Sequence, residues 1–373
     1  MKSAPEILYQ GLLASPASWA HVGRGFVREL TAAGWSVGVV SPRGFLYEPS
    51  LDLTDVPHFA PEEARDARFG VGFLHPPHLD RLVGRTRANF FVWEADRIPQ
   101  EWVPHLEGEG NQILVPSEFT RGALIESGVS AARIALVPFG VVPPSTQPVP
   151  TSSAAFDGVT FLSVVAPHYR KGVEELLTAY RQAFRASDRV RLVIKSTYDP
   201  ADNRRRIPAE IPSWAEARRE AGLDDADAPA LDLRIGRESD AAMAALFAEC
   251  DVYVGPSWGE SFGLAHLEAA AHGRPVIATD WGGVREFLPP GPDRLPYRLV
   301  EDPRSVYVET PGARVARPDI DALVERLRAH VTDRVASRTA GAEHARVARR
   351  WTWSRATRSL LEALRTAETA SLA

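Results

Sequence analysis

Short apolar runs recur along the first 140 residues of the chain and alternate with stretches of helical periodicity. The runs are EILYQGLLA, SVGVVSP, FGVGFLH, NFFVWE, QILVPS and IALVPFG. Two of the intervening stretches, GRGFVRELTAAGW and EFTRGALIESG, space their apolar residues as amphipathic helices do. Because apolar strands that alternate with helices are typical of parallel βαβ units, the pattern predicts an α/β fold.

The same pattern starts again after residue 158. The predicted strands are VTFLSVVAP, VRLVIKS, ALDLRIG, DVYVGPS and PVIATD, and the predicted helices are GVEELLTAYRQAF and DAAMAALFAE. Between the two series, residues 138–153 contain five prolines and no charged residue, which is the composition of a linker. We therefore expect two α/β halves and a final amphipathic helix, WTWSRATRSLLEALRTAETA, capped by Thr352 or Ser354.

Composition and charge exclude several classes of function. With a net charge of -5 and a pI of about 6.1, the chain does not have the basic balance of a nucleic-acid-binding protein. The single cysteine, Cys250, can form neither a disulfide framework nor a cysteine-based zinc site. No apolar run approaches the ~18 residues of a membrane span, so we expect a cytoplasmic protein with at most peripheral membrane association. Residues 198–230, which include three arginines at 204–206, are predicted to be irregular.

Residues 255–268, GPSWGESFGLAHLE, place two carboxylates around the start of a predicted helix. The preceding segment DVYVGPS is a predicted strand, and the helix FGLAHLEAAAHG ends at Gly273. The turn WGES thus lies at the carboxyl end of a parallel strand, where open α/β sheets bind ligands. Free backbone N–H groups at the helix start and the positive end of the helix dipole favour a phosphate there.

The positions of the two acids suit a nucleotide sugar. Glu268 lies about one turn inside the helix, roughly 6 Å along the axis from Leu264 at 1.5 Å per residue. A carboxylate there would repel phosphate but could accept hydrogen bonds from the hydroxyls of an attached ribose. Glu260 precedes the helix and could reach hydroxyls at the far end of a diphosphate. For either acid alone, a helix-start acid or a surface acid remains the simpler interpretation.

In the pattern PSxGESFGLxxLEAxAxGxPVIAT, this segment closely resembles the donor-site motif of retaining glycosyltransferase family 4, the glycosyl transferases group 1. The segment VPSEFTRGALIESGVSAARIALVPFGV is similar to the end of that family's first domain, and RKGVEELLTAY to its basic motif. The resemblance covers most of the chain and implies the GT-B fold, with two Rossmann-like domains that face each other across a cleft. It implies an acceptor domain over residues 1–145, a nucleotide-sugar domain over 155–350, and a tail helix over 351–373 that packs back on the first domain.

The resemblance also implies roles for residues of the motif. The first acid of the family motif contacts the donor sugar and the second contacts the ribose, which gives these roles to Glu260 and Glu268. The backbone between them takes the phosphates and the sugar, at Ser261, Phe262, Gly263 and Leu264.

A lysine before glycine holds the diphosphate in the family, which corresponds to Lys171. Where the family usually has an arginine, this chain has Ala166, so the second cation would be Arg170 or Lys195. The loop RIGRES falls where the family holds the base, and its candidate residues are Ile235, Gly236 and Arg237.

The N-terminal half departs further from the family pattern. The glycine-rich loop after the first strand would fall on SPASWAH, with Ser18, Trp19 and Ala20. A histidine that many members place near the end of a strand would correspond to His75 or His78 in FLHPPH, or be replaced by Glu94 in FVWEADRIP. We favour Glu94 for the acceptor side or for catalysis.

The resemblance thus implies an enzyme, a hexosyl-type glycosyltransferase that retains the anomeric configuration. It would move a sugar from a nucleoside-diphosphate sugar to a saccharide, glycolipid or small-molecule acceptor, with Glu260, Lys171 and Glu94 as catalytic residues. No metal and no cofactor would be needed, and nucleic acid is not a partner. The alternatives are a non-catalytic GT-B protein that binds sugar nucleotides, or a GT-B enzyme of another reaction such as an epimerase or a phosphorylase.

Overall fold

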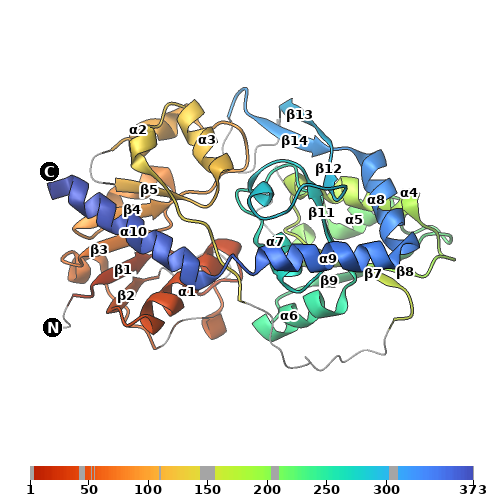
Figure 1. Cartoon of the computed structure of the whole chain (residues 1–373), viewed down its shortest axis with the longest axis horizontal. Coiled ribbons are helices and arrows are strands. Elements are labelled where there is room, and N and C mark those ends of the chain that lie inside the picture. The colour runs from red at the N-terminus through yellow and green to blue at the C-terminus, as the bar shows by residue number, and fades with distance from the viewer. Residues whose placement is uncertain are drawn as a thin grey trace. The chain divides into compact units, whose positions relative to one another are not determined.

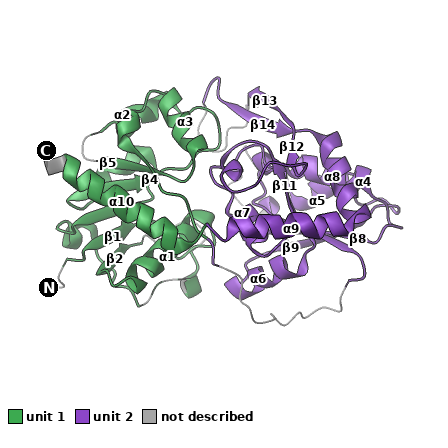
Figure 2. Cartoon of the chain, viewed as in Figure 1, with its two compact units in different colours: residues 1–140, 351–373 green, residues 141–350 purple. Residues whose placement is uncertain are grey.

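The computed structural model describes residues 4–41, 47–51, 53, 55–108, 111–142, 156–202, 210–301 and 310–372. Most of the predicted linker, and the arginines at 204–206, lie outside these residues. The chain divides into two compact units, residues 1–140 with 351–373 (unit 1) and residues 141–350 (unit 2), coloured separately in Figure 2. Each unit contains a six-stranded sheet, so the α/β fold predicted from the alternation of strands and helices is confirmed.

Unit 1 is built on a parallel sheet of order β2-β1-β3-β4-β5-β6. Its strands are β1 (Ile7–Gln10), β2 (Val37–Val40), β3 (Phe69–Gly72), β4 (Thr86–Phe90), β5 (Asn111–Val115) and β6 (Ile134–Leu136). Its longer helices are α1 (Ser18–Ala32), α3 (Glu118–Glu126) and α10 (Trp353–Leu372), and α2 is a single turn (Val103–Leu106). The strands are mainly apolar because both faces of a parallel sheet are buried.

The tail helix α10 packs against α1, β4 and β5 of unit 1 (Figure 1). Thr352 Oγ1 accepts a hydrogen bond from the Arg355 N–H at 3.2 Å, so Thr352 is the cap among the two residues predicted. The Trp353 ring lies edge-on to Phe26 at 5.4 Å, and a Cβ at Gly25 would come within 2.6 Å of the same ring. A glycine in the middle of α1 therefore allows the two helices to approach closely.

Unit 2 contains a second parallel sheet, of order β12-β11-β10-β7-β8-β9. Its strands are β7 (Val159–Val164), β8 (Val190–Ser196), β9 (Ala230–Ile235), β10 (Val252–Gly255), β11 (Val276–Thr279) and β12 (Arg294–Leu295). Numbered from β7 and read from the β9 edge, this is the 3-2-1-4-5-6 order of the Rossmann fold. From β7, successive strands are added toward one edge of the sheet as far as β9, and from β10 they are added toward the other edge. Sheets of this kind bind ligands at that reversal point, outside the carboxyl ends of the strands.

The helices of unit 2 follow the predicted pattern and add to it. The helices α4 (Val173–Ala183), α6 (Asp240–Glu249) and α7 (Leu264–Ala271) lie where the sequence predicts them. Unit 2 also contains elements that were not predicted: an antiparallel pair, β13 (Tyr297–Glu301) with β14 (Arg314–Pro318), and the helices α8 (Ile320–Thr332) and α9 (Arg334–Ala348). None of the helices in the described part of the chain is long and apolar enough to cross a membrane.

Three local predictions were wrong. Residues 198–230 are not irregular throughout, because α5 (Trp214–Glu220) begins there with Ser213 Oγ accepting from the Glu216 N–H at 3.0 Å. The strand predicted at NFFVWE ends at Phe90, and the apolar run continues because Trp93 packs edge-on against Trp102 at 5.2 Å. The loop predicted at SPASWAH is partly helical, since Ser18, Trp19 and Ala20 form the first turn of α1.

Candidate functional site

The parallel order of the unit 2 sheet collects most of the predicted residues at one edge. Carboxyl ends of parallel strands lie on the same side of a sheet. Residues that follow or end neighbouring strands therefore gather there: Arg170 and Lys171 after β7, Lys195 in β8, Ile235 to Arg237 at the end of β9, and the segment from Glu260 after β10. Spacing in the sequence alone does not give this neighbourhood, which depends on the strand order.

The loops after β7 and β10 are joined at the point where the strand order reverses. Gly172 has a φ of +68°, and a Cβ there would lie 2.1 Å from the Pro256 carbonyl oxygen, so only glycine fits. The Trp258 N–H donates to the Arg170 carbonyl at 2.7 Å. In return, Arg170 Nη1 donates to the Gly259 carbonyl at 2.5 Å. The buried Arg170 thus holds the loop that carries the next residue, Glu260.

Glu260 is the centre of a buried cluster of charges. Its Oε1 accepts from Lys171 Nζ at 2.6 Å and from Ser257 Oγ at 2.8 Å, and its Oε2 lies 3.9 Å from Arg170 Nη1. Burial alone would raise the pKa of Glu260, but the Lys171 and Arg170 charges outweigh it and lower the pKa to about 2. The carboxylate is therefore ionised across the physiological range, with two cations beside it.

The helix α7 begins directly after this cluster. Gly263, with a φ of +91°, precedes its first residue Leu264. The first N–H groups of a helix have no acceptor within the helix, so Leu264 and the next positions offer donors for an anion. A carboxylate at 260 and backbone donors just beyond it therefore lie in one short segment, as the sequence predicted.

Glu268 lies on α7, one turn after its start, and is partly buried. Burial, and secondarily the charge of Asp240, raise the pKa of Glu268 to about 7. The two acids of the motif therefore differ in their electrostatics, because cations surround Glu260 whereas Glu268 faces a further acid. Ionising Glu268 costs free energy in the ligand-free chain, and hydrogen-bond donors from a ligand would offset that cost.

Lys195 and Arg170, the two candidates for the second cation, have different surroundings. Lys195 Nζ donates to the Gly236 carbonyl at 2.5 Å and lies 3.3 Å and 3.5 Å from the carbonyls of Ser196 and Arg234. Burial lowers the pKa of Lys195. Its ammonium thus lies with the loop that the resemblance assigns to the base, whereas Arg170 lies with Lys171 and Glu260.

The predicted base loop is open to solvent. Ile235 is 39% exposed, which is unusual for an isoleucine at the end of a strand. Gly236 has a φ of +127° and open space where a Cβ would stand, and Arg237 is exposed. An apolar side chain beside an open glycine offers a flat surface on which an aromatic base could lie.

Several residues of this edge were missed in the sequence. Gly283 donates its N–H to the Glu260 carbonyl at 2.7 Å, and a Cβ at Gly283 would lie 2.0 Å from the Ser261 carbonyl oxygen. Gly282 has a φ of +85°. The paired glycines of DWGGV, directly after the predicted strand PVIATD, were the available signal, because paired glycines after a strand indicate a close approach of two backbones.

A buried histidine supports the other side of the motif. His266 Nε2 hydrogen-bonds the Gly255 carbonyl at 2.9 Å, and a Cβ at Gly255 would lie 2.2 Å from that nitrogen. Burial lowers the pKa of His266, which favours a neutral ring that donates from Nε2. The histidine thereby attaches α7 to the end of β10. His266 lies inside the segment GPSWGESFGLAHLE, but nothing in the sequence distinguishes it from an ordinary helical residue.

A second buried network adjoins the basic turn. Tyr198 Oη donates to Glu210 Oε1 at 2.5 Å and lies 3.3 Å from His168 Nε2. The His168 carbonyl accepts from the Lys171 N–H at 3.0 Å. Burial lowers the pKa of His168 to about 3, so its ring is neutral. This network fixes the backbone from which Lys171 projects.

The predicted residues of unit 1 lie around the reversal point of its own sheet, between β1 and β3. Trp19, on the first turn of α1, lies edge-on to Phe73 at 6.4 Å. The His75 ring lies edge-on to Trp102 at 4.4 Å, and the partial loss of solvent around the ring and the nearby His78 lower its pKa. Glu94 is partly buried and follows β4.

The chain is similar to known glycosyltransferases in sequence. Residues 157–333 match the family model described as glycosyl transferases group 1. The chain is 28% identical over 193 residues to lipopolysaccharide 1,2-N-acetylglucosaminetransferase of Salmonella typhimurium, covering 50% of this chain and 48% of that protein. It is 26% identical over 280 residues to D-inositol 3-phosphate glycosyltransferase of Segniliparus rotundus, covering 70% and 56%. The chain therefore spans about half the length of the curated relatives it matches.

A solved structure shares the fold. The Anabaena protein Alr3699/HepE, crystallised with UDP and glucose, superposes with a TM-score of 0.73 at 14% identity and covers 96% of this chain and 99% of its own. At that identity the likeness concerns the fold alone.

Proposed function

On the premise that the chain is a GT-B protein whose residues 157–333 belong to the glycosyl transferases group 1 family, we propose that it is a glycosyltransferase. It moves a hexosyl group from a nucleoside-diphosphate sugar to a hydroxyl acceptor, retains the anomeric configuration and uses protein cations in place of a metal. The cytoplasmic location expected from the sequence stays a prediction.

The observation that carries the proposal is the Lys171–Glu260 pair at the reversal point of the sheet, beside the start of α7. Without a donor, Lys171 neutralises Glu260 at 2.6 Å. A diphosphate at the helix start would compete for the Lys171 ammonium. The lone pairs that Glu260 then frees would accept hydrogen bonds from the hydroxyls of the donor sugar. The Lys171–Glu260 pair would thus be replaced by a contact of Lys171 with the diphosphate and a contact of Glu260 with the sugar. Binding of the diphosphate would therefore promote binding of the sugar.

The transfer step follows from this arrangement. The bond between C1 of the sugar and the β-phosphate oxygen breaks, and its electron pair stays on the diphosphate. The acceptor oxygen forms the new bond to C1 from the same face, and its proton passes to the departing phosphate oxygen. Lys171 and the N–H groups of α7 stabilise the charge that grows on the leaving group. The carboxylate of Glu260 stabilises the positive charge that develops on the sugar.

The other predicted site residues of unit 2 would bind the nucleotide. We assign the second cation to Arg170, because its guanidinium lies beside Glu260 while the Lys195 ammonium donates to the base loop. Lys195 keeps Ile235 and Gly236 in place for the base, and Glu268 accepts from the ribose. Ionised Glu268 is the better acceptor, so nucleotide affinity should rise as the pH rises toward 7.

Unit 1 would bind the acceptor, with Glu94, His75 and the first turn of α1 as the candidate contacts. We propose a saccharide, a glycolipid or a small polyhydroxylated compound, since relatives of this chain are named for lipopolysaccharide and for inositol 3-phosphate.

Radiolabelled nucleotide sugars test the proposal. With a panel that varies the base and the sugar, we expect one donor to release its nucleoside diphosphate in the wild type, and Lys171→Ala to abolish the release. Donor binding without any release would favour the non-catalytic alternative. Conversion of the donor sugar without release of the nucleotide would indicate an epimerase.

A further inference from the structure

The two six-stranded sheets have the edge strands β2, β6, β9 and β12, and β9 differs from the other three. β2 has four residues, and on its outer side the Val39 N–H donates to the Pro57 carbonyl and the Phe59 N–H to the Val39 carbonyl, both at 2.9 Å. β6 has three residues and β12 has two. β9 has six residues and pairs only with β8 within the described part of the chain. Proteins usually keep edge strands short or covered, because a long open edge can pair with another chain.

Alternate residues of β9 direct their backbone groups toward this open edge. The Gly236 N–H, directly after β9, donates to the Ser196 carbonyl of β8 at 3.0 Å. Backbone groups of a strand point to opposite sides from one residue to the next, so the even-numbered residues of β9 bond to β8. The N–H and C=O groups of Leu231, Leu233 and Ile235 therefore point outward. Among the residues that the structure describes, nothing is hydrogen-bonded to these outer groups.

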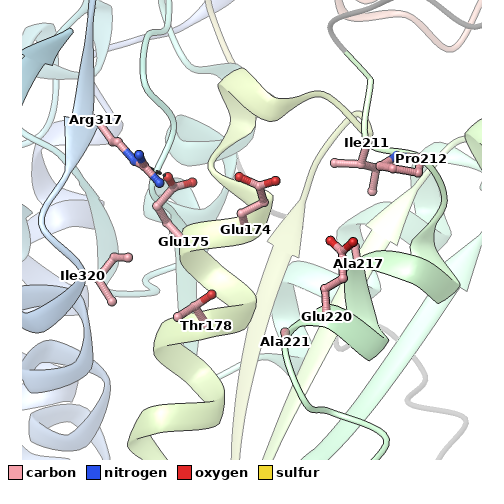
Figure 3. A pocket seen from close by; sticks show the side chains of 10 residues that line it. All are labelled: Glu174, Glu175, Thr178, Ile211, Pro212, Ala217, Glu220, Ala221, Arg317 and Ile320. Atoms are coloured by element: carbon pink, nitrogen blue, oxygen red, sulfur yellow. Dashed lines mark hydrogen bonds and ion pairs between the residues drawn. The ribbon is translucent and has the colours of Figure 1, made fainter.

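The side chains of β9 divide between the two faces of the sheet. Leu231 and Leu233 pack partly against the core that includes α4 and α5, the two helices that border a cavity of about 240 Å³ (Figure 3). Ile235 belongs to the same row, since side chains alternate along a strand. On the other face, Asp232 Oδ2 accepts from Arg234 Nε at 2.9 Å, and both side chains are partly exposed. β9 thus presents an apolar row and a row of one acid and one base.

We propose that β9 pairs antiparallel with β9 of a second copy of the chain. The interface would be isologous, with the same strand in both copies related by a two-fold axis. In an antiparallel pair, residues that exchange hydrogen bonds lie directly opposite each other. Since only the odd-numbered residues of β9 offer outward groups, the axis near the middle of the strand can pass through residue 232, 233 or 234.

The charges of β9 select one of these registers. An axis at residue 232 places Asp232 opposite the same acid of the second copy, and an axis at 234 does so for Arg234. Like charges directly opposite each other are destabilising. An axis at Leu233 instead places each Asp232 opposite Arg234 of the other copy, and each Leu231 opposite Ile235. This register also forms about six backbone hydrogen bonds, two for each pair of odd-numbered residues.

Sedimentation velocity of the chain without nucleotide tests for the dimer. Nucleotide is left out because Ile235 also belongs to the proposed base loop. A pair of six-residue strands is a small interface, so we expect reversible association between about 1 µM and about 200 µM. The mass should rise over this range from 40.8 kDa toward twice that value. A chain that stays monomeric at the highest concentration would overturn the proposal.

Two charge reversals test the register. Asp232→Arg and Arg234→Asp each place like charges opposite each other and should weaken self-association about 10-fold or more. An equimolar mixture of the two variants should dimerise again, because both arginines of one variant face both acids of the other. Arg298→Asp, the same reversal at an exposed position of β13, should dimerise as the wild type does. Self-association of a single variant equal to that of the wild type, or a mixture that stays monomeric while the wild type dimerises, would contradict the pairing.

Amide hydrogen exchange of the wild type gives an answer even if the variants do not fold. The N–H groups of Leu231, Leu233 and Ile235 should exchange more slowly at about 200 µM than at about 1 µM, because the second copy accepts from them. Those of Asp232 and Arg234 bond to β8 in either state and should change little. Exchange of the three outward groups that does not depend on concentration would overturn the proposal. Since the readouts are mass and exchange, their failure leaves the proposed transferase activity untouched.

Discussion

Replacing Glu268 by glutamine should stabilise the free protein while weakening its binding of nucleotide. Burial and Asp240 raise the pKa of Glu268 from 4.5 to about 7 in the folded chain. Between these two pH values, the folded chain holds a proton that the unfolded chain has lost. The contribution of Glu268 to the free energy of unfolding of the wild type therefore falls as the pH rises from about 4.5 to 7, and it stays constant above that. Glutamine has no proton to lose, so the variant escapes this loss.

The size of the effect follows from the two pKa values. A difference of about 2.5 pKa units corresponds to at most ~3.4 kcal/mol, at ~1.36 kcal/mol for each unit. The variant should gain up to ~3 kcal/mol over the wild type at pH 8, but less than ~1 kcal/mol at pH 5. For a domain of the size of unit 2, each 1 kcal/mol shifts the unfolding midpoint by roughly 2–4 °C.

Thermal and urea unfolding of the two proteins from pH 5 to pH 8 measures this difference. Glu325→Gln is the control, because its side chain on α8 is 76% exposed and the change should have little effect at either pH. A Glu268→Gln gain that is the same at pH 5 and pH 8 would refute the electrostatic account. So would a variant that is less stable than the wild type at pH 8.

The same variant tests the ribose assignment. Loss of the charged acceptor should weaken binding of the cognate nucleoside diphosphate by roughly 1.5–3 kcal/mol, or about 10- to 150-fold. The wild-type affinity should rise with pH up to about 7, as Glu268 ionises, and the affinity of the variant should not. Calorimetry of both proteins at pH 5.5 and pH 8 separates these outcomes, and an unchanged affinity would remove Glu268 from the ribose site.

Four further changes probe the rest of the site. Glu260→Gln should leave nucleoside diphosphate affinity intact, because it frees Lys171, while turnover falls; equal losses in calorimetry and in transfer rate would place Glu260 on the phosphate side. Lys171→Ala should cost roughly 2–5 kcal/mol of diphosphate affinity by calorimetry, and a loss below tenfold would contradict its role. Lys195→Ala should weaken the nucleoside diphosphate but not inorganic pyrophosphate, since its ammonium lies with the base loop, and equal losses would make it the second cation. Gly283→Ala should weaken donor binding because its Cβ would meet the Ser261 carbonyl at 2.0 Å, whereas Gly291→Ala, with open space around it, should not; equal Kd values for the two variants would exclude a role of the close contact.

The parts of the fold that could be predicted are those that a local sequence pattern determines. The alternation of apolar runs with helical stretches predicted both sheets, and a strand followed by the GPSWGESFGLAHLE segment predicted that α7 starts between Glu260 and Glu268. A local pattern suffices there because the strand period and the helix start are set by neighbouring residues.

The parts that were missed depend on contacts between distant segments. The loop expected around Ser18 is the start of α1, and the sequence does not reveal that Gly23 lets α1 pack on Tyr9, where a Cβ would lie 2.6 Å from the Tyr9 hydroxyl. Arg170 and Lys195 could not be distinguished as cations, because their surroundings come from Gly259 in one case and Gly236 in the other. Partners so far apart along the chain become visible only once the strand order is known.

A crystal structure of the chain with its cognate nucleoside diphosphate would test the central claim most directly. We predict that the diphosphate lies at the start of α7, with Lys171 Nζ bonded to a phosphate oxygen and no longer to Glu260 Oε1, and that the ribose hydroxyls donate to Glu268. A nucleotide bound at another place on the chain, or a diphosphate at α7 with the Lys171–Glu260 bond unchanged, would contradict the account.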